Sequence, residues 1–415
     1  MPSALSSDER EGKGLIFYLI TVYLILDLVR PDFVWHFPKL ISAILVIAWI
    51  LKPVKVSSVQ IWGFVAFVAI LGLDCLIAEN VFAAVWTTYG MFVLLLGVCL
   101  PLITFTDTFM KLRDLINAVL AIFFYIAVYA ITHGGFGPAG TGGGQDENYV
   151  AAAMNLVIPL AVFSFFTEKV KWKKAMFLTL VGTYVLAIVV GLSRGGFVGL
   201  LCGLGFSLWK SPKRGLAIGL AVLIFTFLGV IAGSSYWAEM GTITDTSEST
   251  ADMRLELWKI ATREFLAYPL TGVGGDNYLW RMHEFQSPEQ LDKFGRIVVA
   301  HVHSTYFQLL SEMGLAGCII FGVIMLRTYL DYRHVDMLSG RALTRAVGQD
   351  NLSQENMRWI QNYGRGLMGG LIGYMASVAF VSALYYSHLW ILVSMIVVLH
   401  KLAIRCIPQK ELTVG

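Results

Sequence analysis

Apolar segments of about 20 residues recur along nearly the whole of this 415-residue chain, and each is long enough to cross a bilayer's hydrocarbon core. Hydrophobic residues make up 57% of the sequence and charged residues only 14%, against about 25% charged residues in soluble domains. The sequence therefore predicts an all-α, polytopic membrane protein.

We predict about twelve membrane spans. They are expected near residues 14–34, 38–52, 60–78, 81–104, 114–132, 148–167, 174–192, 195–209, 215–235, 304–330, 364–384 and 388–404. The chain then divides into three parts: 1–235 with spans 1–9, 236–303 as a large loop carrying short helices, and 304–415 with spans 10–12. The last part also contains a polar stretch near 331–363, which we expect to be a cytoplasmic loop.

The distribution of lysine and arginine predicts the orientation of the bundle. With a cytoplasmic N-terminus, 22 of the 31 Lys and Arg residues fall inside and 9 fall outside, six of these nine in the long loop. Cytoplasmic loops carry such an excess of basic residues. We therefore expect both termini in the cytoplasm, and Arg194 and the 236–303 loop on the outer face.

Composition also argues against several kinds of ligand. The net charge of +3 is too small to favour a nucleic-acid partner, and the five cysteines form no pattern typical of a disulfide framework or a zinc site. The first outer loop lacks a DxD or ExD pair that would hold a divalent cation against a diphosphate. We therefore predict no metal and no cofactor, with arginines as the groups that neutralise a bound anion.

Arg194 lies in the sequence SRGG between two apolar runs. A guanidinium group costs roughly 2.5–3.5 kcal/mol to insert at mid-bilayer. We therefore expect Arg194 to face an anion or a water-filled cavity rather than lipid.

A second arginine lies in a predicted helix of the long loop. In ADMRLELWKIATREFLAYPL, helical periodicity places Arg254, Leu257, Trp258 and Ala261 on one face. Arg263 is nine residues from Arg254 and falls on the opposite face. One hypothesis is that this helix offers Arg254, with Trp258, to a lipid-linked anion. The alternative is an amphipathic helix that lies on the membrane with snorkelling basic residues.

The next segment, PLTGVGGDNY, contains Gly272, Gly274 and Gly275. Exposed amides in such a turn could bind an oxyanion, or the segment could be an ordinary loop after Pro269. It is not a Walker motif, because no GK[ST] follows.

His301 and His303 precede the tenth span, at its outer mouth. A histidine there titrates near neutral pH and could take a proton from an acceptor hydroxyl. A metal-binding H-x-H pair lacks a third ligand nearby. Glu312 lies on the helix face opposite His303, so we expect it to brace the bundle. Tyr306 is either a contact for substrate or an ordinary interface anchor.

Three segments in this order resemble the O-antigen ligase/polymerase superfamily of bacterial envelope glycosyltransferases. They are SRGGFVGL at 193–200, RLELWKIATREFLAYPLTGVGGDNY at 254–278 and HVHSTYFQLLSEMGLAG at 301–317. The DEN at 146–148 is similar to the family as well, whereas Ser304 stands where asparagine is commoner. The resemblance implies a glycosyltransferase-C-like bundle and a glycan donor carried on undecaprenyl diphosphate.

Carried over residue by residue, the resemblance implies that Arg194 and Arg254 bind the diphosphate. It implies His303 as the catalytic residue, with His301 as second choice. It also implies substrate contacts from a further set of residues: Trp258, Gly274, Asn277 and Tyr306.

The expected activity is that of an O-antigen ligase of a bacterial inner membrane, with no metal and with inversion at the anomeric carbon. It would transfer O-polysaccharide to a hydroxyl of the lipid A–core oligosaccharide at the periplasmic face. Three alternatives remain open: an O-antigen polymerase, a protein O-oligosaccharyltransferase, and a flippase or transporter for lipid-linked sugars.

Overall fold

The computed structural model describes residues 14–30, 37–52, 55–139, 146–241, 249–295, 297–345 and 351–406. All regular elements within these ranges are helical, which confirms the all-α prediction. In chain order they are α2 (Leu15–Val29), α3 (Phe37–Leu51), α4 (Val59–Asp74), α5 (Val81–Leu94), η3 (Leu95–Cys99), α6 (Leu100–Phe105), α7 (Phe109–Thr132), α8 (Glu147–Thr167), α9 (Lys171–Val190), α10 (Arg194–Lys210), α11 (Arg214–Ile231), α12 (Ser234–Gly241), α13 (Ser249–Ala267), α14 (Tyr278–Arg281), η5 (Met282–Phe285), α15 (Pro288–Phe294), α16 (Thr305–Arg345), α17 (Asn351–Ser377), η6 (Val378–Phe380) and α18 (Ser387–Cys406).

Seven helices of the described chain are long and apolar enough to cross a membrane. They are Val81–Phe105, Phe109–Thr132, Glu147–Thr167, Lys171–Val190, Arg214–Ile231, Thr305–Thr344 and Ser387–Arg405. Three shorter apolar helices, α2, α3 and α4, and two further helices, α10 and α17, occupy the remaining predicted span positions. The structure is therefore that of a polytopic helical membrane protein.

The stretch near 331–363, which we expected to be a loop, is largely helical. Helix α16 continues to Arg345 and α17 begins at Asn351. Polar side chains of this region pair between helices. Asp336 of α16 accepts hydrogen bonds from Arg365 of α17 at 2.8 Å and from Lys210 of α10 at 3.3 Å. These pairs let the helices continue beyond their apolar portions. The cytoplasmic location of this stretch stays a prediction.

Helices α8, α10 and α17 form the most closely packed part of the bundle. Asn155 of α8 joins all three, since its Nδ2 donates to the Gly196 carbonyl of α10 at 2.7 Å and to Ser377 Oγ of α17 at 2.8 Å. A Cβ at Gly366 of α17 would lie only 2.8 Å from the Leu160 Cα of α8. Small residues thus allow backbone-to-backbone approach, as is common between membrane helices.

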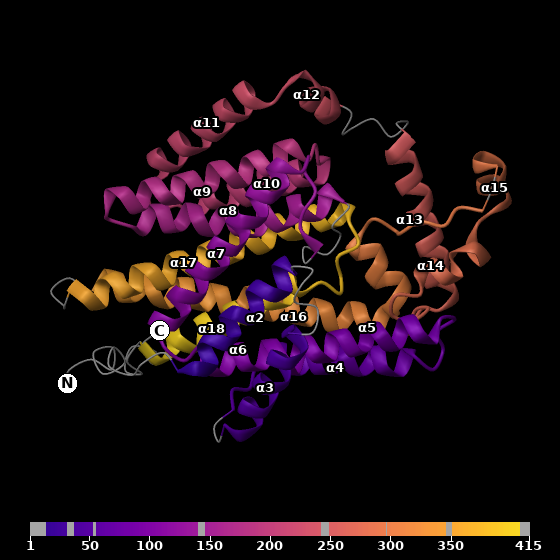
Figure 1. The fold of residues 1–415 in the computed structure, drawn as a ribbon, viewed down its shortest axis with the longest axis horizontal. Coiled ribbons are helices and arrows are strands. Elements are labelled where there is room, and N and C mark those ends of the chain that lie inside the picture. The colour runs from indigo at the N-terminus through magenta and orange to yellow at the C-terminus, as the bar shows by residue number, and fades with distance from the viewer. Residues whose placement is uncertain are drawn as a thin grey trace.

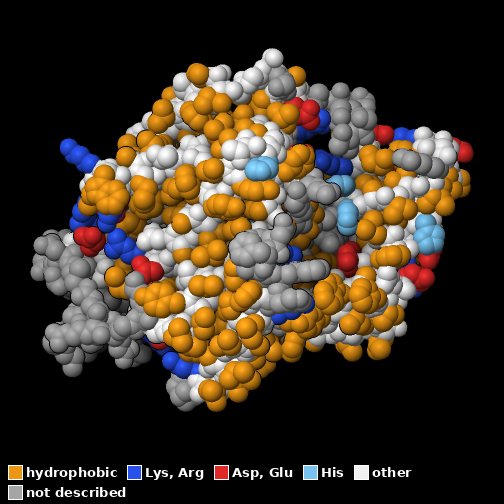
Figure 2. Space-filling model, viewed as in Figure 1, with side chains coloured by type: hydrophobic (Ala, Val, Ile, Leu, Met, Phe, Trp, Pro, Cys, Tyr) orange, Lys and Arg blue, Asp and Glu red, His pale blue; other side chains and the backbone are white. Residues whose placement is uncertain are grey.

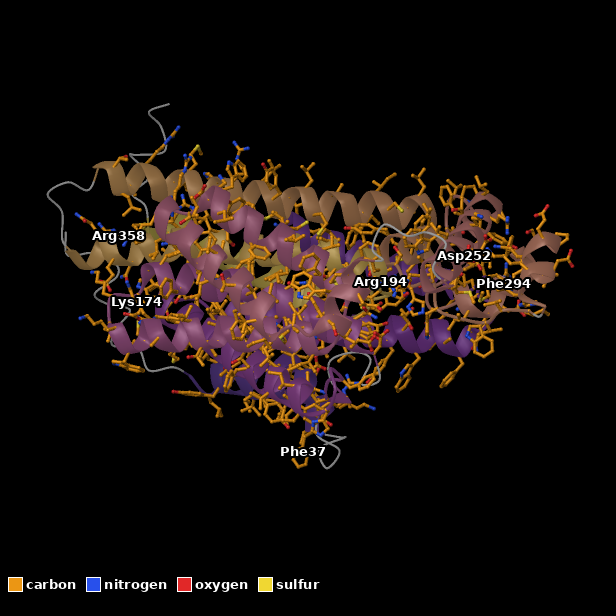
Figure 3. The ribbon with its side chains drawn as sticks, turned by 90° about the horizontal axis from the view of Figure 1, so that it is seen from above. Phe37, Lys174, Arg194, Asp252, Phe294 and Arg358 are labelled. Carbon is orange, nitrogen blue, oxygen red and sulfur yellow. The ribbon has the colours of Figure 1, made fainter. Side chains whose placement is uncertain are left out.

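The charged groups collect toward the two ends of the bundle. In Figure 1 the long helices run along the longest axis, and α13, α14 and α15 project at one end. Lys174 and Arg358 lie at the other end, whereas Arg194 and Asp252 lie toward the α13 end (Figure 3). Between the ends, hydrophobic side chains cover most of the face seen in Figure 2. This segregation agrees with alternating spans; which end faces the cytoplasm stays a prediction.

A kink in α16 joins the bundle to the segment that follows α13. Gly314 adopts φ 57° and ψ −156°, which interrupts the helix. The amides of Leu315 and Ala316, which lose helical partners at the kink, donate to the carbonyls of Pro269 and Leu270 at 2.8 and 3.2 Å. The loop therefore satisfies backbone groups that would otherwise be buried without partners.

Candidate functional site

Arg194 is the first residue of α10, and a hydrogen-bonded chain fixes the start of this helix. Ser193 caps the helix by accepting from the Gly196 amide at 2.9 Å, and its hydroxyl donates to Asn148 Oδ1 at 2.7 Å. Asn148 in turn donates to Asp146 at 2.8 Å. The DEN segment thus positions the turn that carries Arg194.

The guanidinium of Arg194 pairs with a carboxylate that the sequence analysis missed. Its Nε and Nη2 lie 2.7 and 2.6 Å from Oε1 of Glu239 in α12. A cation at a helix N-terminus is disfavoured by the helix dipole, so this carboxylate compensates. Glu239 lies in the short segment SSYWAEMG, whose sequence carries no pattern typical of a site.

Arg254 of α13 faces the bundle and belongs to the same electrostatic group. Its charge acts on Glu147 at the start of α8 and on His303. Glu147 also interacts with Glu239, the partner of Arg194. The two arginines, although 60 residues apart in sequence, are therefore linked through two carboxylates. We call Arg194, Glu239, Glu147, Arg254, Asp146 and His303 the charged cluster.

His303 completes the charged cluster on the side of Arg254 and Asp146. It adopts φ 48°, a left-handed conformation that is uncommon for a residue with a side chain. Burial, followed by the positive charge of Arg254, lowers the pKa of His303 below its ordinary value, while Asp146 opposes the shift. The lowered pKa favours the neutral imidazole, which can accept a proton.

Trp258 holds the segment that carries the two histidines. Its Nε1 donates to the carbonyl of Val302 at 3.1 Å, between His301 and His303, and its ring stacks on Phe307 of α16 at 5.0 Å. The structure thus assigns Trp258 a positioning role. A direct contact between Trp258 and substrate stays a prediction.

His301 is exposed and lies beside Asp276 rather than beside the arginines. Burial raises the pKa of Asp276, and the charge of His301 opposes the rise. His301 also interacts with His303. The two histidines are therefore neighbours with different surroundings: Arg254 acts on His303, and His301 acts on Asp276.

Gly274 and Asn277, predicted to contact substrate, make hydrogen bonds and close contacts within the protein. The Gly274 amide donates to the Glu312 carbonyl at 3.0 Å, and a Cβ at Gly274 would lie 3.1 Å from Ala78. Asn277 is fully buried; its Oδ1 accepts from the Asn80 amide at 2.7 Å and its Nδ2 donates to the Gly275 carbonyl at 2.9 Å. These polar groups are already hydrogen-bonded within the protein; a contact of either residue with substrate stays a prediction.

Tyr306 and Glu312 show how the start of α16 is braced. The Tyr306 hydroxyl donates to the Met375 carbonyl of α17 at 3.0 Å, so the interface-anchor alternative has a structural basis. Glu312 is buried and accepts from the Tyr385 hydroxyl at 2.7 Å and from Gln308 at 3.3 Å. The predicted bracing role of Glu312 is confirmed.

The predicted division of faces on α13 is also confirmed. Arg263 points away from Arg254 and donates to the Phe285 carbonyl at 2.9 Å and to Gln290 Oε1 at 2.7 Å. It therefore fastens α13 to the η5–α15 region. Within the described residues, no group of three His, Cys, Asp or Glu side chains could hold a metal ion; the absence of a metal requirement stays a prediction.

The fold and the charged cluster together define a polytopic membrane protein with a charged, histidine-containing site near one end of its bundle. Figure 2 shows Lys, Arg and His side chains close together where the α13 end meets the bundle.

Residues 175–322 match the family model described as O-antigen ligase, which confirms the resemblance to that superfamily. The matched range contains Arg194, Glu239, Arg254 and both histidines. The family covers ligase- and polymerase-type membrane enzymes that act on lipid-linked glycans. No curated protein matches the chain.

Proposed function

We propose that this protein is an O-antigen ligase of the bacterial inner membrane. It transfers O-polysaccharide from undecaprenyl diphosphate to a hydroxyl of the lipid A–core oligosaccharide at the periplasmic face. The observation that carries the proposal is the charged cluster, in which Arg194, Arg254 and His303 come from three separate segments; Glu239 and Glu147 link the two arginines, and Arg254 acts on His303.

The two arginines suit a diphosphate leaving group. Charge grows on the departing phosphate oxygen as the glycosidic bond breaks, and preorganised cations stabilise that charge. A guanidinium can contact phosphate oxygens through two parallel N–H groups. Arg194 directs its Nε and Nη2 at Oε1 of Glu239, so a phosphate oxygen that binds this edge takes the place of that carboxylate oxygen.

His303 suits the role of general base. It deprotonates the acceptor hydroxyl as that oxygen attacks the anomeric carbon on the face opposite the diphosphate, which inverts the configuration. Neutral imidazole is required for this step, and the lowered pKa of His303 supplies it. Neither a metal nor a nucleotide is needed in this scheme.

A deletion strain examined for its lipopolysaccharide bands tests the proposed activity. A ligase predicts loss of the whole O-antigen ladder, with polymer accumulating on the lipid carrier. A single capped repeat would instead identify a polymerase. An unchanged ladder with altered glycoproteins would identify a protein O-oligosaccharyltransferase. Loss of the lipid-linked polymer from the periplasmic leaflet of the inner membrane would identify a flippase.

The transfer rate should fall at acid pH, and the midpoint of this acid limb should lie below pH 6.5, the ordinary pKa of histidine. The base acts unprotonated, so a lowered pKa moves the loss of activity to lower pH. Asp146→Asn should move this limb lower still, because Asp146 raises the pKa of His303. Asparagine can still cap α8. The measurement is the rate against pH at saturating substrates; a limb above pH 6.5, or one that moves upward in Asp146→Asn, would contradict the assignment.

A further inference from the structure

A cavity of about 320 Å³ lies beside the charged cluster and is not used by the reaction described above. It is bounded by the end of α2, the start of α3, one face of α5 and residues 385–387. Its lining combines two cations, one carboxylate and several aromatic rings: Asp27, Arg30, Lys39, Trp86, Tyr89 and Tyr386.

The two cations are held at the cavity by local contacts. Arg30 caps α2 in a left-handed conformation, with φ 49°, and its Nη2 lies 3.7 Å from Asp27 Oδ1. The Lys39 ammonium lies 5.5 Å from the centre of the Trp86 ring. Two cations in one cavity favour a phosphate group, while the aromatic faces and the Asp27 carboxylate offer surfaces for a sugar ring and its hydroxyls.

The cavity is electrostatically connected to the charged cluster through Tyr386. This residue lines the cavity, and its hydroxyl interacts with the charges of Arg30, Asp146 and Asp276. Asp146 also acts on His303, and Asp276 on His301. The Tyr386 ring also packs edge-on against the Tyr149 ring, with centroids 5.0 Å apart. A ligand that contacts Tyr386 therefore lies beside the start of α8, which carries Glu147.

The cavity also adjoins surface that is suited to lipid tails. Phe37 and Leu40 of α3 are 56% and 59% exposed, and Phe82 and Trp86 of α5 are 76% and 57% exposed. Phe37 lies at the outer edge of the bundle in Figure 3. A lipid could keep its acyl chains against these apolar side chains while its headgroup occupies the cavity.

We propose that this cavity binds a phosphorylated sugar of the acceptor glycolipid, an inference that rests on the proposed function. The proposed function assigns the diphosphate of the lipid-linked donor to Arg194 and Arg254, which leaves the cavity to the acceptor.

Binding of the acceptor alone tests the site without relying on transfer. The full chain in phosphatidylcholine nanodiscs is titrated with purified lipid A–core, and with the same glycolipid after chemical dephosphorylation. Arg30→Gln combined with Lys39→Gln should weaken binding of the native acceptor about tenfold or more, and should have little effect on the dephosphorylated acceptor. Lys55→Gln is the matched control. The Lys55 ammonium lies 4.4 Å from the centre of the Trp49 ring, much as Lys39 lies over Trp86, but Lys55 does not line the cavity.

A kinetic measurement separates acceptor from donor. The double variant should raise the KM for the acceptor and leave kcat and the KM for the donor close to the wild-type values. Unchanged acceptor binding, a rise in the donor KM, or equal displacement by phosphatidylglycerol would each overturn the proposal. Failure of the proposed function has a different signature, because the wild-type chain would then not transfer the glycan even if it bound the acceptor.

Discussion

Replacing His303 by asparagine is expected to lower the rate of glycan transfer roughly 10²–10⁴-fold, the usual contribution of a general base. His303 is the histidine that shares an interaction with Arg254. Asparagine is the informative replacement, because it tolerates the left-handed backbone conformation of this position while removing the base. Alanine removes the same base but adds backbone strain, so a loss found only with alanine would indicate a structural effect.

The rate should be measured as kcat with purified full-length protein, lipid-linked donor and acceptor. His283→Asn is a suitable control, since His283 lies exposed in η5. His301→Asn is expected to cost less than His303→Asn, because His301 is exposed and interacts with Asp276. Retention of wild-type kcat by His303→Asn would remove His303 from the mechanism and leave His301 as the base to be tested.

Replacing Arg254 by alanine is expected to lower kcat roughly 10²–10³-fold, the cost of removing one group that stabilises developing negative charge. The same is expected of Arg194→Ala. Lysine at either position should restore only part of the rate, since an ammonium retains the charge but not the two parallel N–H groups. Full transfer by Arg194→Lys would contradict bidentate binding of the diphosphate.

Lys259→Ala is the matched control for Arg254→Ala, because Lys259 lies on the same helix with its side chain 59% exposed. It should leave kcat near the wild-type value. Chelation of divalent cations gives an independent check: activity that is lost on chelation and restored by a metal would contradict the proposal that arginines alone neutralise the diphosphate.

Much of the architecture was predictable, because the length of an apolar segment is dictated by the thickness of the bilayer. Helix periodicity also predicted that Arg254 and Arg263 face opposite ways. The prediction failed where the outcome depends on a distant partner. Residues 331–345 continue α16 because Asp336 pairs with Arg365 and Lys210 on other helices. No local sequence pattern predicts that pairing.

The same limit applies to the candidate site. Gly274 and Asn277 occur in a segment whose glycines suggest an anion-binding turn, but their polar groups are bound by Glu312, Asn80 and Gly275. Glu239 was missed because its importance arises only when α12 comes beside the start of α10. A local pattern indicates which groups need partners, whereas the tertiary fold decides which partners they find.

The break at Gly314 has a consequence for building hybrid enzymes from related chains. The turns of α16 before the break are hydrogen-bonded to residues 269–277, since the amides of Val273 and Gly274 donate to the carbonyls of Ser311 and Glu312. These turns therefore form one packed unit with the segment that follows α13, although their sequence continues into a span. A graft that exchanges acceptor or donor preference should place its junction after Ala316, whose amide donates to the Leu270 carbonyl, and not at the lipid boundary.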